Sequence, residues 1–392
     1  MSQVHDIPFL VVGGGIGGLA TAFGLARTER DVTVLEQAPE FGELGAGIQL
    51  APNATAVLDQ LGVLDQILKF AVFPKRLVLM DALTGKELSS LHLEDAFRKR
   101  YQYPYVVLHR SDLHKSLLDA CRANNRITLL TDKSVQTVEN VNDKAAVVCS
   151  DGSKYQADAV IGADGLWSKT RKMFSQDEAV CSEYVAYRGT IPMSEIGVTA
   201  EMDDVIMWIG PNMHLVQYPV RRGDLYNQVV VFKSFRYKKD SDDWGTPEEI
   251  EEHFGVCCSP VLHAVKFISR QRRWPMYDRE PLDNWTSGRV ALLGDAAHPM
   301  LQYLAQGGCQ ALEDAACLTK LLVNNSNVQE AFRAYQEERI PRTARVQRNA
   351  RTFGEIIHST NPISVLLRNT IMQERSPDDV RFVDWLYARR YN

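Results

Sequence analysis

A glycine-rich turn between a predicted buried strand and a predicted helix constrains the fold of this chain more than any other feature. Residues 7–12 form a short apolar run that is typical of a strand buried on both faces. The sequence GGGIGG follows at 13–18, small and apolar residues at helical spacing occupy 19–26, and a second apolar run over 32–35 ends at Glu36. Strand, G-x-G-x-x-G turn, helix, strand and acid in this order predict a Rossmann-like nucleotide-binding domain of the α/β class.

Each residue type in this unit has a physical task in binding a dinucleotide. Gly13 permits the tight turn, Gly15 lets the backbone approach a pyrophosphate, and Gly18 lets the helix pack closely against the sheet. The free amides and the positive dipole end of the helix receive the phosphates, and the Glu36 carboxylate accepts hydrogen bonds from ribose hydroxyls. The motif does not separate FAD from NAD. The residues predicted to contact the cofactor here are Gly13, Gly15, Ile16, Gly18, Glu36 and Gln37.

The composition excludes several classes of protein. The chain has 392 residues, enough for two or three domains, and 45% of them are hydrophobic. A net charge of −5 argues against a general affinity for nucleic acid, and no apolar run reaches the ~20 residues that span a membrane. Seven scattered cysteines without a CxxC pair argue against a disulfide scaffold and a structural zinc site. The cysteine pattern thus predicts no bound metal. Residues 1–15 lack the features of a secretory signal, so together with the few cysteines they lead us to expect a cytoplasmic protein.

Two later segments repeat the pattern of a buried strand that runs into a turn. Residues 160–162 lead to Asp164, and residues 290–293 lead to Gly294 and Asp295, after which another helix is predicted. Ligands of open α/β sheets bind beyond the carboxyl ends of the strands, so Asp164 is expected to touch one. Because these segments lie far apart in the sequence, we predict that the nucleotide-binding domain is discontinuous.

The region from about 180 to 280 has a different pattern. Short segments alternate between apolar and polar residues, which is typical of a mainly antiparallel sheet inserted into the nucleotide-binding domain. The alternation places His214, Val216 and Tyr218 on one face of their strand. Taken alone, a histidine in such a strand is more often hydrogen-bonded within the sheet than aimed at a ligand.

Four motifs follow one another along the chain. They are VVGGGIGGLATA with Glu36, HRSDL from His109, IGADGLWSKTR from Ile161, and LLGDAAHP with its following GG and ALEDA. Together they resemble the single-component, FAD-dependent aromatic hydroxylases of the para-hydroxybenzoate hydroxylase type, over nearly the whole chain. Within that family the chain is most similar to 3-hydroxybenzoate 6-hydroxylases, with salicylate 1-hydroxylases and 6-hydroxynicotinate 3-monooxygenases as close relatives. The segments that carry this finer resemblance are 210–219, 273–281 and 299–308.

The resemblance implies FAD as the cofactor and gives roles to matching positions. The glycine-rich turn would hold the ADP half of FAD, and Arg110 would lie against the flavin. Gly294 and Asp295 would bind the ribityl chain and the pyrophosphate, while Asp164 would serve both FAD and the nicotinamide nucleotide. Ala305 belongs to the loop that would run along the isoalloxazine ring. NADH or NADPH would bind transiently, because no separate nicotinamide domain is visible.

The loop after the GDAAH motif departs from the family pattern in two ways. Family members usually have a proline where Gln302 stands, and the G-x-G-x-N pattern becomes AQGGC over 305–309. These departures put in doubt a direct transfer of the family's backbone contacts to the flavin. They also place a side-chain amide where an aromatic substrate ring should lie.

The family chemistry indicates which residues should act on an aromatic substrate. NAD(P)H reduces FAD, O₂ then gives a flavin hydroperoxide, and its distal oxygen attacks an electron-rich ring. In 3-hydroxybenzoate, carbon 6 is para to the hydroxyl, so a base at the phenol directs hydroxylation there and gives 2,5-dihydroxybenzoate (gentisate). We predict His214 as that base, since an ordinary histidine pKa of ~6.5 suits work near neutrality. Gln302 would hydrogen-bond the same oxygen, Tyr218 would contact the substrate or its carboxylate, and Gln49 is a weaker candidate.

Other activities stay open at this point. A salicylate hydroxylase would release CO₂, and a 6-hydroxynicotinate 3-monooxygenase would act on a pyridine ring. A flavin dehydrogenase or reductase on the same fold would consume NADH without inserting oxygen. A non-catalytic nucleotide-fold protein, of the kind that escorts prenylated proteins, would bind no yellow cofactor.

Residues 328–392 are predicted to form helices that pack on the outside of the molecule. Arginines at helical spacing from 342 to 351 indicate a solvated face or salt bridges between subunits, so a homodimer is one assembly that the sequence allows. The predicted division of the chain is an FAD-binding domain over 1–180 with inserted strands at 72–106, a substrate domain over 181–280, a second FAD-binding part over 281–327 and a helical segment over 328–392.

Overall fold

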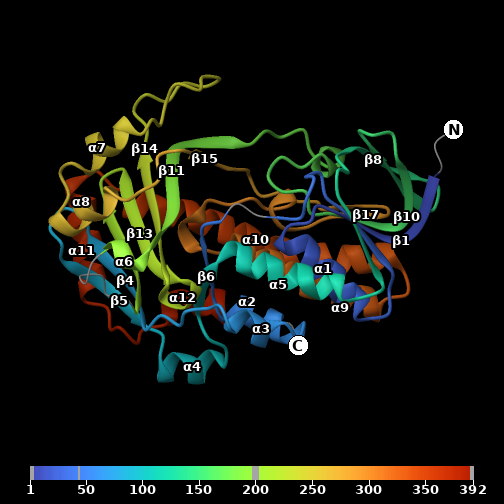
Figure 1. Ribbon diagram of the computed structural model, residues 1–392, viewed down its shortest axis with the longest axis horizontal. Coiled ribbons are helices and arrows are strands. Elements are labelled where there is room, and N and C mark those ends of the chain that lie inside the picture. Colours follow the sequence, from blue (N-terminus) through green and yellow to red (C-terminus); the bar gives the residue numbers. More distant parts are fainter. Residues whose placement is uncertain (1–3, 43–44, 197–202, 389–392) are drawn as a thin grey trace.

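Two large β-sheets, one toward each end of an elongated molecule, form the framework of the fold (Figure 1). The computed structural model describes residues 4–42, 45–196 and 203–388. Long helices run along the middle of the molecule, and β1, the first strand, lies at one end (Figure 1). The mixed architecture, with helices closing the chain, confirms the predicted α/β class.

The first sheet grows from the predicted βαβ unit. Its strands lie in the order β16-β17-β10-β1-β2-β7, with all but β16 parallel, and β8 and β9 form a hairpin that pairs with β10. Strands from distant parts of the sequence thus lie side by side. The bounds are β1 Val4–Val12, β2 Val32–Leu35, β7 Ile127–Leu130, β8 Val135–Val141, β9 Lys144–Cys149, β10 Lys154–Gly162, β16 Thr286–Ser287 and β17 Val290–Leu292.

The second sheet is the antiparallel one predicted from the alternating region. Its order is β15-β11-β14-β13-β12-β4-β5, and only β12 and β4 pair in parallel. Strands β4 and β5 come from the inserted segment 72–106 and extend this sheet. A separate pair, β3 with β6, completes the strands. The bounds are β3 Gly47–Leu50, β4 Arg76–Asp81, β5 Glu87–His92, β6 Val106–His109, β11 Val180–Pro192, β12 Asp204–Gly210, β13 Met213–Val220, β14 Leu225–Lys233 and β15 Arg273–Asp278.

Helices α1, α5 and α9 pack together along the first sheet, and α10 packs on α9. Throughout the ranges that the structure describes, no helix has the length and apolar character needed to cross a membrane. The bounds are α1 Ile16–Ala26, α2 Pro52–Gln60, α3 Leu64–Leu68, α4 Asp95–Tyr101, α5 Arg110–Arg122, α6 Met193–Ile196, α7 Glu248–Phe254, α8 Ser259–Val265, α9 Gly307–Asn324, α10 Val328–Ile357, α11 Pro362–Gln373 and α12 Arg381–Tyr387.

Helix α10, which the sequence predicted as a charged helix on the outside of the molecule, also forms buried ion pairs with α9. Arg339 and Arg342 are buried, and their guanidinium groups lie 2.6 Å from carboxylates of α9: Arg339 from Glu313 and Asp314, and Arg342 from Glu313. Burial alone would raise the pKa of Glu313, but the two guanidinium groups hold it below its usual value. The solvated or intersubunit face predicted for these arginines is therefore wrong for Arg342, because its side chain turns toward α9.

Candidate functional site

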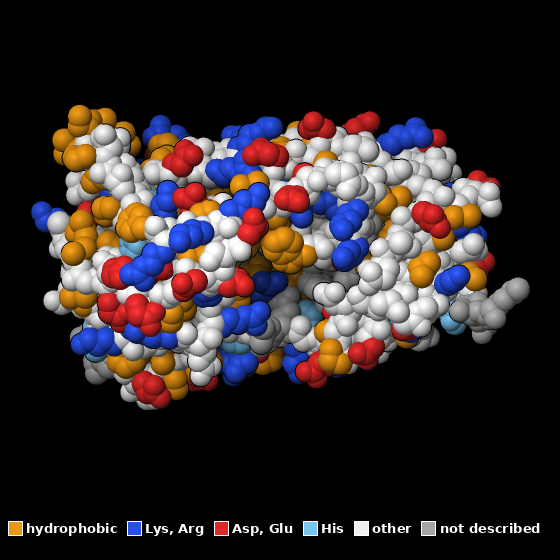
Figure 2. Space-filling model, turned by 90° about the horizontal axis from the view of Figure 1, so that it is seen from above, with side chains coloured by type: hydrophobic (Ala, Val, Ile, Leu, Met, Phe, Trp, Pro, Cys, Tyr) orange, Lys and Arg blue, Asp and Glu red, His pale blue; other side chains and the backbone are white. Residues whose placement is uncertain are grey.

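A cavity of about 720 Å³ lies between the two sheets. Its volume is in the range usual for sites that bind small molecules and cofactors. The molecule is visibly hollowed near its middle (Figure 2). One end of the cavity is lined by the glycine-rich turn and the start of α9, and the other by β4, β12, β13 and α10.

The glycine-rich turn has the close contacts that its sequence requires. Gly13 has a φ of +107°, and a Cβ there would lie 2.3 Å from the carbonyl oxygen of Ala163. A Cβ on Gly18 would lie 2.0 Å from the carbonyl oxygen of Gly13, so α1 reaches the turn only with glycine at this position. At Gly15, by contrast, the space in front of the backbone is open. The turn therefore leaves an uncovered helix N-terminus that fits a pyrophosphate.

Glu36 ties the end of β2 to this turn. Its two carboxylate oxygens accept hydrogen bonds from the backbone N–H groups of Gly14 at 2.8 Å and Ala38 at 2.9 Å. Each oxygen keeps a further lone pair with which it can accept a ribose hydroxyl. Gln37 is exposed beside it. The contact of Glu36 and Gln37 with a nucleotide stays a prediction.

Most residues assigned to the flavin half of the cofactor surround the cavity. Asp295 is exposed just beyond the end of β17, where a carboxylate can accept hydrogen bonds from sugar-like hydroxyls. Ala305 adopts a left-handed backbone conformation, with φ of +52°, at the end of a single 3₁₀ turn. The assigned residues that line the cavity are Gly15, Ile16, Arg110, Gly294, Asp295 and Ala305.

The Asp164 side chain forms hydrogen bonds within the turn that follows β10. Its Oδ1 accepts a hydrogen bond from the Ser168 hydroxyl at 2.6 Å, and its Oδ2 accepts from two following backbone N–H groups at 2.8 and 3.0 Å. The flanking residues Ala163 and Gly165 line the cavity instead. The strand ends beside the cavity as expected, and the short carboxylate caps the turn that follows it. Contact of Asp164 with a nucleotide stays a prediction.

The loop between β17 and α9 offers a hydrogen-bond donor for a flavin. Oε1 of Gln306 accepts hydrogen bonds from Asn53 and Gln310, both at 3.0 Å, which fixes the orientation of the amide. Its Nε2 is buried without a hydrogen-bond partner among the residues described, and Gln306 lines the cavity. A buried donor without a partner is costly, and a carbonyl oxygen of an isoalloxazine ring would satisfy it. The residues present therefore fit FAD.

Strand β13 presents a histidine and a tyrosine to the other end of the cavity. His214, Val216 and Tyr218 line it, while the two residues between them do not, which confirms the predicted face of this strand. The Tyr218 ring packs so closely on β3 that a Cβ at Gly47 would lie 2.4 Å from it. Burial raises the pKa of Tyr218 above its usual value, so the phenol stays protonated and can donate a hydrogen bond.

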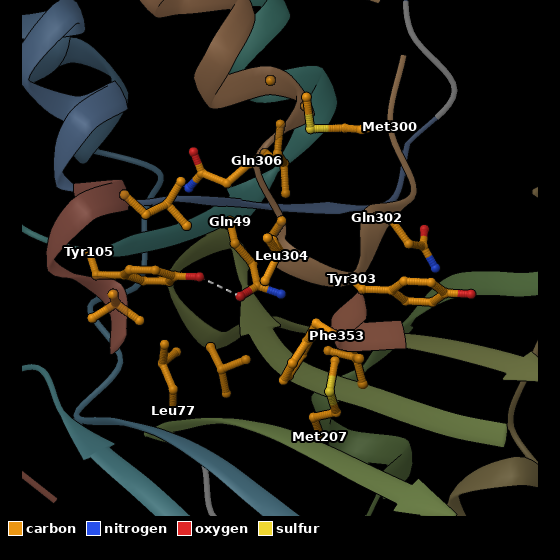
Figure 3. Close-up of a pocket in the computed structure, with 18 of the residues that line it drawn as sticks. Gln49, Leu77, Tyr105, Met207, Met300, Gln302, Tyr303, Leu304, Gln306 and Phe353 are labelled. Carbon is orange, nitrogen blue, oxygen red and sulfur yellow. Dashed lines mark hydrogen bonds between the residues drawn. The ribbon is translucent and has the colours of Figure 1, made fainter. Parts of the chain in front are cut away.

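Gln49 and Gln302 lie on different sides of the cavity. Tyr105 Oη donates a hydrogen bond to Gln49 Oε1 at 2.6 Å, and Gln302 and Tyr303 lie on the side away from this pair (Figure 3). Gln302 is exposed, although it lines the same cavity as His214. That Gln302 and His214 bind one substrate oxygen together stays a prediction.

The apolar walls of the cavity come from elements that the sequence did not connect with the site. Leu77 of β4 lies on the Tyr105 side of the cavity, and Met207 of β12 and Phe353 of α10 lie between Gln49 and Tyr303 (Figure 3). Each is an ordinary hydrophobic residue in its own segment, so no local pattern marks it as part of a site. In the part of the chain that the structure describes, no three His, Cys, Asp or Glu side chains come together as a metal site.

His214 is 1% exposed. Burial first, and then a neighbouring imidazole, lowers the pKa of His214 well below its usual value. The ring is therefore neutral at pH 7, with a lone pair that can accept a hydrogen bond from a phenol. The ordinary pKa assumed from the sequence is wrong for this buried ring, which is a weaker base than a free imidazole.

Comparison with known proteins agrees with this geometry. Residues 6–350 match the family described as FAD binding domain. The chain belongs to this family. It is an FAD-dependent enzyme of the hydroxylase class, which confirms the predicted cofactor and excludes a non-catalytic nucleotide-fold protein.

Similar proteins span nearly the whole chain. A 3-hydroxybenzoate 6-hydroxylase of Polaromonas naphthalenivorans (strain CJ2) is 40% identical over 387 residues, which are 98% of this chain and 96% of that protein. The 3-hydroxybenzoate 6-hydroxylase 1 of Aquipseudomonas alcaligenes is 37% identical over 382 residues, 97% of each chain. The crystal structure of Klebsiella pneumoniae HpxO complexed with FAD and uric acid superimposes with a TM-score of 0.84 at 25% identity, covering 94% of this chain and 93% of that one.

Gly18→Ala is expected to weaken FAD binding. The added methyl group would overlap the carbonyl oxygen of Gly13, so α1 would move away from the turn and would have to return to bind the pyrophosphate. Overpacking of this kind costs about 1–3 kcal/mol, which is about 5- to 150-fold in the dissociation constant of FAD. Flavin fluorescence titration of the apoprotein measures it. Gly189→Ala, where the new Cβ meets Ser269 at an ordinary 3.4 Å, is the control; equal affinities in both variants would contradict the expectation.

Proposed function

We propose that this enzyme hydroxylates 3-hydroxybenzoate at carbon 6 to give 2,5-dihydroxybenzoate, with O₂ and NADH or NADPH as co-substrates. The observation that carries the proposal is the cavity that joins the flavin-binding loop to the face of β13 with His214 and Tyr218. The names of the two relatives, at 40% and 37% identity, favour this substrate over salicylate or a hydroxypyridine acid.

The side chains around the cavity suit a ring that carries a hydroxyl and a carboxylate. When bound, FAD accepts a hydride from NAD(P)H and passes one oxygen atom of O₂ to the substrate. The chain's own residues hold and activate the ring: neutral His214 accepts the phenolic proton, and the negative charge of the phenolate spreads to the ortho and para carbons. The carboxylate lies near Tyr218 and the positive charge of Arg188, which lines the same cavity. Apolar walls exclude water from the reacting carbon.

Product identification on a substrate panel tests the proposal. We expect 3-hydroxybenzoate to stimulate NAD(P)H oxidation and to yield 2,5-dihydroxybenzoate, with salicylate and 6-hydroxynicotinate converted far more slowly. Parallel assays with NADH and NADPH identify the preferred reductant. Release of CO₂ from salicylate at the higher rate would instead indicate a decarboxylating hydroxylase, and faster turnover of 6-hydroxynicotinate would indicate a pyridine hydroxylase.

We also propose a reducing, cytoplasmic location, which the seven free cysteines of the structure support. Association into a homodimer stays a prediction that analytical ultracentrifugation would test.

A further inference from the structure

A second buried imidazole contacts His214. Nδ1 of His214 and Nε2 of His358 lie 2.7 Å apart, and the two rings stack with centroids 4.9 Å apart and planes inclined by 21°. His358 is 4% exposed and follows the last residue of α10. Within the described residues, Nε2 of His214 has no protein partner, so this nitrogen is left for a ligand in the cavity.

The position of His358 is firmly held. Its backbone N–H donates to the carbonyl oxygen of Gly354, and its carbonyl oxygen accepts from the N–H of Asn212, both at 3.0 Å. Tyr184 of β11 stacks on its ring at 4.6 Å, and Tyr303 meets it edge-on at 5.2 Å. Because these contacts hold the His358 ring in one orientation, His358 can in turn hold the orientation of the His214 ring that it contacts.

The surroundings of the pair keep it uncharged at neutral pH. Burial, and then the charge of Arg368, lowers the pKa of His358 to about 3. Burial raises the pKa of Tyr184 to about 12 and that of Tyr303 still higher, so both phenols are neutral. Two neutral imidazoles can share one hydrogen bond only if one nitrogen carries the proton and the other does not.

We propose that His358 is a positioning residue that accepts a hydrogen bond from Nδ1–H of His214 and thereby leaves Nε2 of His214 unprotonated toward the substrate phenol. The inference rests on the proposed function, in which His214 takes the phenolic proton. That proton moves from the phenol oxygen to Nε2 of His214; the phenol becomes a phenolate and His214 an imidazolium. Nδ1–H continues to donate to His358, so the orientation of the His214 ring is kept while the proton moves.

As the hydrogen-bond partner of Nδ1–H of His214, a neutral imidazole is more suitable than a carboxylate would be. A carboxylate beside Nδ1 would favour the imidazolium before substrate arrives, and a protonated His214 could not accept the phenolic proton. His358 orients the ring without this penalty. In the opposite tautomer His358 would donate to His214, and Nε2–H of His214 would face the phenol as a donor, which hinders proton removal.

The test is a pH titration of bound substrate in the wild-type holoenzyme and in two variants at His358. Ultraviolet difference absorption of 3-hydroxybenzoate on oxidised holoenzyme reports the formation of phenolate as the pH is raised. His358→Phe keeps a ring in place but accepts no hydrogen bond, and His358→Gln restores an acceptor oxygen. We expect His358→Phe to shift the midpoint upward by about one unit and to lower kcat by about 10- to 100-fold with a smaller change in KM, and His358→Gln to recover most of the loss.

The outcomes separate this inference from the proposed function. A His358→Phe titration and kcat equal to wild type, or a His358→Gln variant as impaired as His358→Phe, overturns the role of His358 while leaving the proposed function intact. Wild-type enzyme that neither perturbs the spectrum of 3-hydroxybenzoate nor converts it overturns the proposed function. Should His358→Phe fail to fold, ¹⁵N chemical shifts of the His214 ring in the wild type decide: a protonated Nδ1 and an unprotonated Nε2 support the inference, and the reverse overturns it.

Discussion

His214→Ala is expected to reduce the rate of hydroxylation by about 10²- to 10⁴-fold, the usual contribution of a positioned general base. His214 lies on β13, at the end of the cavity opposite the glycine-rich turn. FAD should therefore remain bound in this variant. Stopped-flow and steady-state assays with 3-hydroxybenzoate, at equal flavin content, measure the loss. Product should form slowly while NAD(P)H is still oxidised, since reduction of the flavin does not need the phenolic proton to move.

His253→Ala is the matched control for this variant. His253 is also a largely buried histidine next to the second sheet, where it stacks on Phe232 at 4.9 Å, but it does not line the cavity. The control should keep nearly full activity. Full activity in His214→Ala, or equal losses in both variants, would remove His214 from the chemistry.

Arg339→Met is expected to lower the free energy of unfolding by about 3–5 kcal/mol, the usual effect of removing one partner from a buried ion pair. Arg339 is fully buried, and its loss leaves Asp314 and Glu313 in the interior with one positive partner fewer. Asp314 also accepts a hydrogen bond from the N–H of Gly294 at 2.9 Å, so the turn beside the flavin should loosen as well. Urea unfolding of the holoenzyme at fixed excess FAD measures the change.

Arg348→Met on the same helix provides the comparison. Arg348 is exposed, and surface substitutions usually stay within about 0.5 kcal/mol of wild type. A loss in Arg339→Met no larger than that in Arg348→Met would show that the network between α9 and α10 contributes little to stability.

Much of the fold could be predicted because its signals are local. The turn at 13–18 combines glycines, an apolar strand and a helix within a short stretch, and the structure has Ile16–Ala26 as α1. The two-residue period of a strand was enough to predict which side chains of β13 share a face, because successive side chains point to opposite sides. That rule placed His214 and Tyr218 together in the cavity.

The remaining features depend on contacts between distant segments, which no local pattern contains. His358 lies 144 residues from His214, and nothing in the helix that precedes it points to a partner. Charged spacing along α10 suggests a solvated face, yet Arg342 turns toward Glu313 of another helix. For Asp164 the strand end was informative, but whether a short carboxylate reaches outward or caps its own turn depends on backbone geometry.

The fate of molecular oxygen tests most directly that the cavity hydroxylates an aromatic ring. Holoenzyme would be incubated with 3-hydroxybenzoate and NAD(P)H under ¹⁸O₂, and the product analysed by mass spectrometry and NMR. We expect 2,5-dihydroxybenzoate with one ¹⁸O atom in the hydroxyl at the former carbon 6. Consumption of NAD(P)H that yields only hydrogen peroxide and unlabelled 3-hydroxybenzoate would contradict this function and indicate a flavin reductase on the same fold.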